Sequence, residues 1–170
     1  MKKLKKFNEE VFVDFVRGNK ENFYRHAFSY VKNKADALDI VQDSIHKAMV
    51  SFHTLQDEKM LKSWFYRIVV NTSLDFLRKH KRVHIIDSET MEFISQGKED
   101  HYDNLDLERA IEQLPPEYRN IIVLRYFEDL KIEEVAAVLE ENTNTIKTRL
   151  YKALKILRIE MQDEHFAEVK

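Results

Sequence analysis

Two blocks of the sequence concentrate positively charged side chains. Residues 59–82 hold seven basic residues and one acid, and residues 145–158 hold five basic residues and no acid. Clustered Lys and Arg form the electrostatic footprint of a surface that binds a polyanion. The whole-chain net charge of −2 hides them, because residues 87–112 carry nine acids against two bases. The two blocks predict two separate contacts with a polyanion.

The first block interleaves its cations with three consecutive aromatic residues, Trp64, Phe65 and Tyr66. Single-stranded nucleic acid binds to surfaces where bases stack on aromatic rings and cations follow the backbone, and each stacked base contributes about 1–3 kcal/mol. The same aromatic residues could belong to an apolar core, and for Phe65 and Ile68 we favour that interpretation. For the block as a whole, the residues alone leave both readings open.

The second block predicts a helix with one apolar and one polar face. At about 100° per residue, one sector collects the apolar residues Ile146, Leu150, Ala153, Leu154 and Leu157. The opposite side collects amide, hydroxyl and cationic groups, which suit base edges and phosphates; it holds Asn144, Thr148, Tyr151, Lys152 and Lys155, flanked by Lys147 and Arg149. The short segment 140–143 separates this helix from a helical pattern at 132–139, as in a helix-turn-helix. A surface helix with solvated lysines is the competing interpretation.

A third set of polar residues is acidic. Asp36, Asp39 and Asp43 share one face of a helix predicted to begin near Lys34, with Gln42 beside them. The opposite face is predicted to be an apolar stripe of Leu38, Val41, Ile45, Ala48 and Met49. The acids could form a solvated face, a docking surface for a protein or a metal site.

We expect no metal site and no cofactor. Asp43 and His46 have the spacing of the carboxylate-x-x-His pairs in di-metal bundles, but the second pair and the bridging glutamates are missing. His80 and His84 form one pair without a third ligand, and we expect them to lie near phosphate. The chain has no cysteine and only two glycines, which excludes thiol chemistry and disfavours glycine-rich phosphate loops. No Ser/His/Asp arrangement can be assembled, so we predict that the protein is not an enzyme.

The elements that position these residues are predicted to be helices, because apolar spacing is helical nearly throughout. We expect a break at Gly18, a long helix over 63–82, and a helix from Leu107 that stops at Pro115. Another helix is expected over 117–128, then two more over 132–139 and 146–157. No apolar run approaches the length of a membrane span, and the basic start lacks the apolar core of a signal peptide, so we expect a soluble, cytosolic protein.

The fold class predicted is all-α, with two small helical domains. Helical periodicity fails between residues 85 and 104, which are polar, acidic and contain Gly97. A segment of this length without structure is unusual inside a compact domain. We therefore predict one domain over 1–85, a flexible acidic linker over 86–104 and a second domain over 105–170.

The second domain resembles region 4 of the bacterial sigma-70 family, and more narrowly its extracytoplasmic-function (ECF) subgroup. The resemblance rests on residues 114–119 (LPPEYR), Arg125-Tyr126, residues 132–136 (IEEVA) and residues 145–150 (TIKTRL). It implies a helix-turn-helix that reads the −35 promoter element, through Asn144, Thr145, Lys147, Thr148, Arg149 and Lys152. At the turn the family usually has Gly followed by an apolar residue, where this chain has Glu140 and Glu141. We therefore expect a helix end without its usual left-handed glycine.

The first domain resembles region 2 of the same family. Residues 63–71 (SWFYRIVVN) and 75–79 (DFLRK) resemble the parts that melt and hold the −10 element. By this resemblance Asn71 and the loop 52–62 are candidates for holding an unstacked base, and the cations would follow phosphates. The implied −10 residues are Lys62, Trp64, Tyr66, Arg67, Asn71, Arg78, Lys79, Lys81 and Arg82.

Residues 36–43 (DALDIVQD) resemble the segment of region 2 that binds the clamp helices of the RNA polymerase beta-prime subunit. This assigns Asp36, Asp39, Gln42 and Asp43 to binding of the polymerase core. Ile45 replaces an aromatic residue usual in the family, and since the volume is roughly kept we expect the packing to survive.

The family implies three partners: polymerase core, promoter DNA and an anti-sigma factor, often membrane-bound, which could hold the protein at the inner face of the membrane. No small-molecule substrate is implied. Two alternatives stay open. One is a LuxR-like regulator whose first domain senses a ligand or phosphoryl group and which binds duplex DNA alone. The other is a helical adaptor whose basic faces bind acidic proteins rather than DNA.

Overall fold

The computed structural model describes the backbone of residues 9–86 and 105–167, and the side chains of residues 9–81 and 107–161. Over the described residues the chain is helical and contains no strand. The predicted linker, apart from Ile86, lies outside the described residues. None of the helices within 9–86 and 105–167 is both long and apolar enough to span a membrane.

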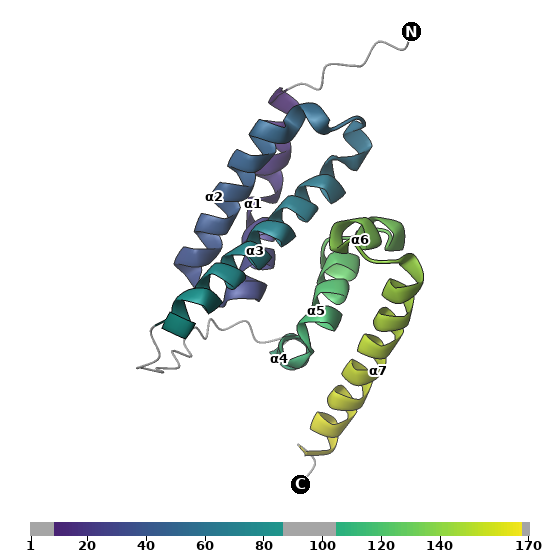
Figure 1. Ribbon diagram of the computed structural model, residues 1–170. Coiled ribbons are helices and arrows are strands. Elements are labelled where there is room, and N and C mark those ends of the chain that lie inside the picture. The colour runs from purple at the N-terminus through teal and green to yellow at the C-terminus, as the bar shows by residue number, and fades with distance from the viewer. Residues whose placement is uncertain (1–8, 87–104, 168–170) are drawn as a thin grey trace.

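The N-terminal half is a bundle of three helices, α1 (Glu9–Val31), α2 (Lys34–Ser51) and α3 (Leu61–Ile86), in which each helix packs against the other two (Figure 1). Asn33 caps α2 by accepting a hydrogen bond from the Asp36 N–H at 3.1 Å, as short polar residues do at helix N-termini. Two short 3-10 turns, η1 (Phe52–Thr54) and η2 (Glu58–Met60), lead from α2 to α3. The bundle therefore places the acidic helix beside the basic, aromatic one.

The expected break at Gly18 is wrong, because α1 continues through this residue without interruption. A glycine inside a helix is less favourable than alanine by about 1 kcal/mol. Aromatic packing on both sides offsets this, since Phe12, Phe15 and Phe23 all pack against Phe65 of α3. Tertiary contacts thus stabilise α1 on both sides of Gly18, so the helix continues through this residue.

The predicted apolar stripe of α2 is partly wrong. Leu38 and Met49 are exposed, at 52% and 66% of their full surface. The buried side is formed by Ala37, Ile40, Val41, Ser44 and Ala48. The helix is rotated relative to the prediction, because small residues allow α1 and α3 to approach closely on that side.

The C-terminal half contains α4 (Leu105–Gln113), α5 (Pro116–Ile122), the π-helical turn η3 (Val123–Phe127), α6 (Ile132–Leu139) and α7 (Thr143–Ala167). Long α7 packs against α4, α5 and α6 (Figure 1). Pro116 occupies the first turn of α5, as predicted. The helix expected over 117–128 widens at its end, where the Glu128 N–H bonds to the Val123 carbonyl at 3.0 Å.

The two halves share apolar contacts through α3 and α6. Phe65 and Val69 of α3 belong to the same buried cluster as Leu124, Leu130 and Val135 of the C-terminal half. A second cluster lies within the C-terminal half; it contains Ala110, Ile111, Leu114, Ile122, Ala153 and Leu157. The face of α3 that turns toward α6 is the aromatic, basic one.

Candidate nucleic-acid interface

The polar face of α7 is open to solvent. Asn144, Lys147, Thr148 and Lys152 are exposed, and Thr145 is half-buried. The opposite side anchors the helix, because Ile146, Ala153 and Leu157 are buried. Leu154 was predicted to join them but is 41% exposed, since it lies at the edge of the apolar sector. The arrangement leaves amide, hydroxyl and ammonium groups free to meet a groove.

The turn before α7 keeps the left-handed geometry that glycine usually provides, although its residue is Glu140, with φ 56° and ψ 38°. A non-glycine residue in this region costs about 1–2 kcal/mol. The Glu141 N–H bonds to the Ala136 carbonyl at 3.0 Å, which closes the helix end as in a Schellman motif. Asn142 then starts α7 by accepting from the Asn144 N–H at 2.8 Å. A well-formed turn thus holds α6 and α7 together.

Arg149 is the one predicted −35 residue of the described chain with an ion-pair partner. Its guanidinium lies 3.0 Å from the Glu141 carboxylate, and its side chain is 34% exposed. Glu141 therefore orients the arginine from the turn, although it also competes with phosphate for the same cation.

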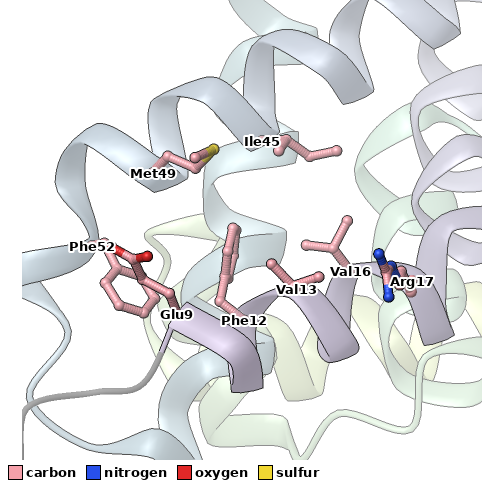
Figure 2. A pocket seen from close by; sticks show the side chains of 8 residues that line it. All are labelled: Glu9, Phe12, Val13, Val16, Arg17, Ile45, Met49 and Phe52. Atoms are coloured by element: carbon pink, nitrogen blue, oxygen red, sulfur yellow. The ribbon is translucent and has the colours of Figure 1, made fainter.

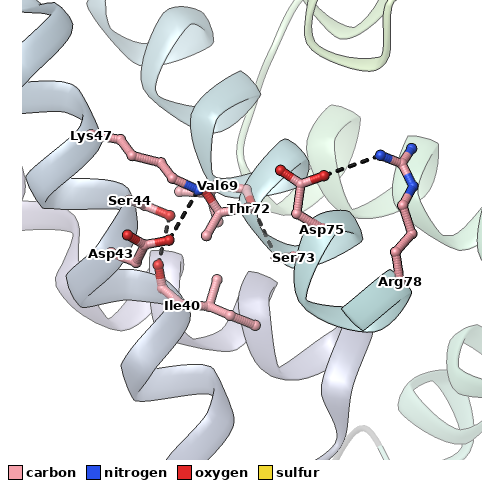
Figure 3. Close-up of polar contacts among 9 residues, drawn as sticks. All are labelled: Ile40, Asp43, Ser44, Lys47, Val69, Thr72, Ser73, Asp75 and Arg78. Carbon is pink, nitrogen blue, oxygen red and sulfur yellow. Dashed lines mark hydrogen bonds and ion pairs between the residues drawn. The ribbon is translucent and has the colours of Figure 1, made fainter. Parts of the chain in front are cut away.

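The predicted −10 residues on α3 lie in different environments. Arg67, Asn71, Arg78, Lys79 and Lys81 are exposed, whereas Lys62 and Trp64 are half-buried. Arg78 pairs with Asp75 at 3.1 Å on the exposed side of the helix (Figure 3). The side chain of Arg82 lies outside the described residues. A row of cations thus follows the solvent side of α3.

A hollow of about 220 Å³ lies where α3 meets the loop between α2 and α3. Leu55, Gln56, Trp64 and Arg67 line it, and Ala137 of α6 contributes to its wall. The loop was predicted to help hold an unstacked base. In the hollow, loop residues lie beside the Trp64 ring and the Arg67 guanidinium.

Tyr66 is fully buried, at 0% exposure, and its hydroxyl donates a hydrogen bond to the carboxyl group of Glu128. Lys62 donates to the main-chain carbonyl of the same residue. Burial raises the pKa of Glu128 above its ordinary value, against the opposing effects of Tyr66 and Lys62. Burial also raises the pKa of the Tyr66 hydroxyl, so the phenol remains the donor. In this arrangement Tyr66 faces protein rather than solvent.

Arg67 joins the two halves a second time. Its Nε and Nη2 atoms lie 2.9 and 2.6 Å from one carboxylate oxygen of Glu140. The hydrogen bonds from Arg67 lower the pKa of Glu140. Sequence reasoning missed both Glu128 and Glu140 as partners of α3, because each lies more than sixty residues away along the chain. The only local sign was the acid at a position where glycine is usual.

The acidic side of α2 is largely open to solvent. Asp39, Gln42 and Asp43 are exposed and Asp36 is half-buried. Lys47 links this side to the bundle: it lies 3.0 Å from Asp43 and donates to the Thr72 hydroxyl of α3 at 3.2 Å (Figure 3).

An apolar hollow of about 340 Å³ lies between α1 and α2. Figure 2 shows Ile45 and Met49 of α2 facing Phe12, Val13 and Val16 of α1 across it. Ile45 thus lines a surface hollow whose charged lining residues, Glu9 and Arg17, belong to α1. A mostly apolar hollow suits contact with a protein better than contact with DNA.

No group of three or more metal-binding side chains occurs within the part of the chain whose side chains are described. His80 stacks on Phe76, with ring centroids 4.1 Å apart. The side chain of His84 lies outside the described residues.

Family comparisons match both halves. A model described as Sigma-70 region 2 matches residues 15–83, and one described as Sigma-70, region 4 matches residues 104–157. The chain is 54% identical over 162 residues to RNA polymerase sigma factor SigV of Bacillus subtilis (strain 168), covering 95% of this chain and 98% of that protein. It is 30% identical over 178 residues to ECF RNA polymerase sigma factor SigW of the same organism, covering 96% and 95%.

Two solved structures share the fold. The sigma factor RpoE of Bartonella quintana, in complex with the anti-sigma factor NepR, superposes with a TM-score of 0.71 at 23% identity, covering 88% of this chain and 97% of that one. CnrH, in complex with the cytosolic domain of CnrY, superposes with a TM-score of 0.63 at 19% identity, covering 92% and 90%.

Proposed function

The chain belongs to the ECF subgroup of the sigma-70 family, and we propose that it is the specificity subunit that recruits RNA polymerase core to a defined set of promoters. One observation carries this proposal. A single chain presents a helix-turn-helix whose second helix carries no acid over residues 145–158 and, separately, a long helix that combines aromatic residues with cations. The protein acts in the cytoplasm, where it directs initiation without catalysing a reaction of its own.

The C-terminal half reads the −35 element as duplex DNA. The polar face of α7 fits the major groove, where amide and hydroxyl groups reach base edges and cations reach phosphates. The contacting residues are Asn144, Thr145, Lys147, Thr148, Arg149 and Lys152, of which four are exposed.

The N-terminal half captures the opened strand of the −10 element. Trp64 and Arg67 line the hollow beside α3, and this combination suits a base that has left the stack. Asn71 lies one helical turn beyond Arg67 on the exposed side. The remaining cations, Arg78, Lys79, Lys81 and Arg82, follow the strand's phosphates.

The acidic side of α2 docks on the clamp helices of the polymerase beta-prime subunit through Asp36, Asp39, Gln42 and Asp43. Exposed carboxylates on one face of a helix offer a partner a charged surface. DNA would be repelled by the same carboxylates, which supports a protein partner.

An anti-sigma factor controls access to these surfaces. Two sigma factors of the same fold are seen bound to such partners, RpoE to NepR and CnrH to the cytosolic domain of CnrY. We propose a membrane-bound partner of this kind, which keeps the protein at the inner face of the membrane until it is released.

Run-off transcription with bacterial core polymerase and a promoter library tests the proposal. We expect transcripts from a subset of promoters that share −35 and −10 sequences. A chain that never directs initiation above core alone, on any member of the library, would exclude the sigma function.

The polymerase dock has its own test. Asp39→Arg reverses a charge on the exposed side of α2 and should weaken core binding about tenfold or more. Lys20→Glu on α1 also changes one exposed charge and serves as the control. Equal core affinities for the two variants would show that the acidic side is only a solvated face.

A further inference from the structure

We propose that two copies of the chain associate through α1, each seating its Val13 in the apolar hollow between α1 and α2 of the other copy. The contact is antiparallel and two-fold symmetric, with Val13 of both copies near the axis. The residues that carry this inference have no role in the proposed function, so the two proposals can fail separately.

The hollow leaves apolar side chains of both helices open to solvent. Val13 of α1 is 43% exposed and Met49 of α2 is 66% exposed. Val16 and Ile45 line the same hollow and are half-buried. A surface of this composition is stabilised when the apolar atoms of another molecule replace water on it.

The two charged residues of the hollow, Glu9 and Arg17, lie at its opposite ends, with Val13 between them (Figure 2). The three residues follow one another at intervals of four, which places them on one side of α1 and separates the two charges by about 12 Å along the helix. Both charged residues are exposed, and within the described part of the chain neither has an ion-pair partner. This side of α1 therefore carries an acid at one end, a base at the other and an aliphatic side chain at its centre.

This order of charges is complementary to itself. In an antiparallel pair of α1 helices centred on Val13, Glu9 of each copy lies opposite Arg17 of the other, because both residues are four positions from the centre. A parallel pair would instead place like charges opposite each other, which is unfavourable. A contact in which both copies use the same surface closes at two copies. The charges thus identify a second copy of the chain as the occupant of the hollow.

The space between the helices fits the same arrangement. The hollow has a volume of about 340 Å³, and Ile45 and Met49 face α1 across it (Figure 2). An antiparallel α1 can place one side chain in this space, and symmetry makes the insertion reciprocal, so that α1 and α2 of both copies pack as a small bundle. One hollow per copy is a small contact compared with the interfaces of about 1,200 Å² or more that stable complexes use. The association is therefore weak and depends on concentration.

Sedimentation equilibrium of the full chain measures the association. We expect the average mass of the parent chain to rise from that of a monomer toward that of a dimer as its concentration approaches the millimolar range. Arg17→Glu turns both symmetry-related attractive pairs into like-charge pairs and should weaken the association about tenfold or more. Lys34→Glu is the matched control: it reverses an exposed positive charge at the start of α2, away from the hollow, and should leave the association unchanged.

A charge exchange guards against effects of folding. Glu9→Lys combined with Arg17→Glu places acid opposite base again and should restore the association of the parent chain, with helicity checked by circular dichroism. Failure of the exchange to restore association in a folded protein would overturn the proposal, as would equal effects of Arg17→Glu and Lys34→Glu.

A disulfide can trap the contact, because the chain has no cysteine. Val13→Cys places the thiols of two copies near the axis, and mild oxidation should link them faster than it links Val50→Cys. Val50 is 65% exposed, more than Val13, but does not line the hollow, so exposure alone predicts the opposite order. Adding Arg17→Glu should slow the cross-link of Val13→Cys about tenfold and leave that of Val50→Cys unchanged. Equal rates for the two cysteine variants would contradict the proposal.

A parent chain that stays monomeric up to millimolar concentration would also overturn the proposal, whether its hollow is then covered by another part of the chain or by a different protein. These measurements need neither promoter nor polymerase. If the chain dimerises as described yet fails in run-off transcription, the proposed function fails and the dimer stands; if it transcribes but does not dimerise, the reverse holds.

Discussion

The two cationic surfaces of the molecule carry similar side chains in opposite states. Each contains a tyrosine: Tyr151 on α7 is 72% exposed, whereas Tyr66 on α3 is 0% exposed. Each contains an arginine paired with an acid from the same turn region. Arg149 pairs with Glu141 inside its own half, and Arg67 pairs with Glu140 across the two halves.

The difference fits the targets that we propose for the two surfaces. Duplex DNA is a preformed target, and a rigid, open helix face meets it without rearrangement. An opened strand needs aromatic rings and concave space, and such groups bury themselves against protein when no strand is present. Composition alone therefore does not define a binding face, because the tyrosine of α7 is exposed whereas that of α3 is buried.

Replacing each tyrosine by alanine should give the largest difference between the two surfaces, measured as the loss in free energy of unfolding. Tyr66→Ala removes a buried ring that packs edge-on against Phe23 and His26, and should lower the free energy of unfolding by about 3–5 kcal/mol. Tyr151→Ala should change it by less than about 0.5 kcal/mol. Urea unfolding measures both. Tyr66→Phe keeps the ring and should retain most of the stability, and equal losses for the two alanine variants would contradict the contrast.

The next largest effect should be a loss of stability at low pH, caused by the buried His26 of α1. Burial lowers the pKa of His26 from its ordinary 6.5 to about 4, and neither ring nitrogen has a hydrogen-bond partner among the described residues. Between these two pKa values His26 binds a proton in the unfolded chain but not in the folded protein. Above pH 6.5 His26 therefore has no effect on the free energy of unfolding. As the pH falls from 6.5 toward 4, His26 lowers this free energy by about 3 kcal/mol in total.

The measurement compares urea unfolding of the parent chain and His26→Leu between pH 7.5 and 5. Glu128 has a raised pKa and acts in the opposite direction, but it is present in both proteins, so the difference isolates His26. A parallel pH dependence of the two proteins would show that the histidine does not titrate as a buried group.

The smallest of these effects concerns α7. Lys152→Ala and Arg149→Ala should weaken binding to duplex DNA containing the −35 element, and each lost phosphate contact should reduce the slope of log K against log salt by about 0.9. Lys20→Ala on α1 is the control. An unchanged slope and an unchanged −35 preference in both variants would contradict the assignment of this face to the major groove.

Local features of the chain could be predicted because they depend on nearby residues. The 3.6-residue spacing and Pro115-Pro116 predicted the helices before α7 within a few residues, and the ends of α6 match, but α7 continues ten residues beyond the predicted end at Leu157. Where packing decides, prediction failed: Gly18 does not break α1, and Leu38, Met49 and Leu154 are exposed. Periodicity identifies an apolar face but not which neighbour covers it.

The contact between the halves could not be predicted at all. Glu128 follows Leu124 at helical spacing, in a segment that gives no sign of a buried acid bonded to Tyr66. Glu140 differs from the usual glycine, but its partner Arg67 is known only from the fold. Pairings at such separations depend on tertiary packing, which no local pattern encodes.

Mapping where each half meets promoter DNA tests the proposed function most directly. A cleaving iron chelate can be attached to His80→Cys on α3 or to Lys155→Cys on α7, since the chain has no other cysteine. In complexes with core polymerase on promoters chosen by transcription, the α7 chelate should cut duplex DNA near −35 and the α3 chelate should cut the opened strand near −10. Cleavage at one common place, or cleavage that does not depend on core polymerase, would contradict the account.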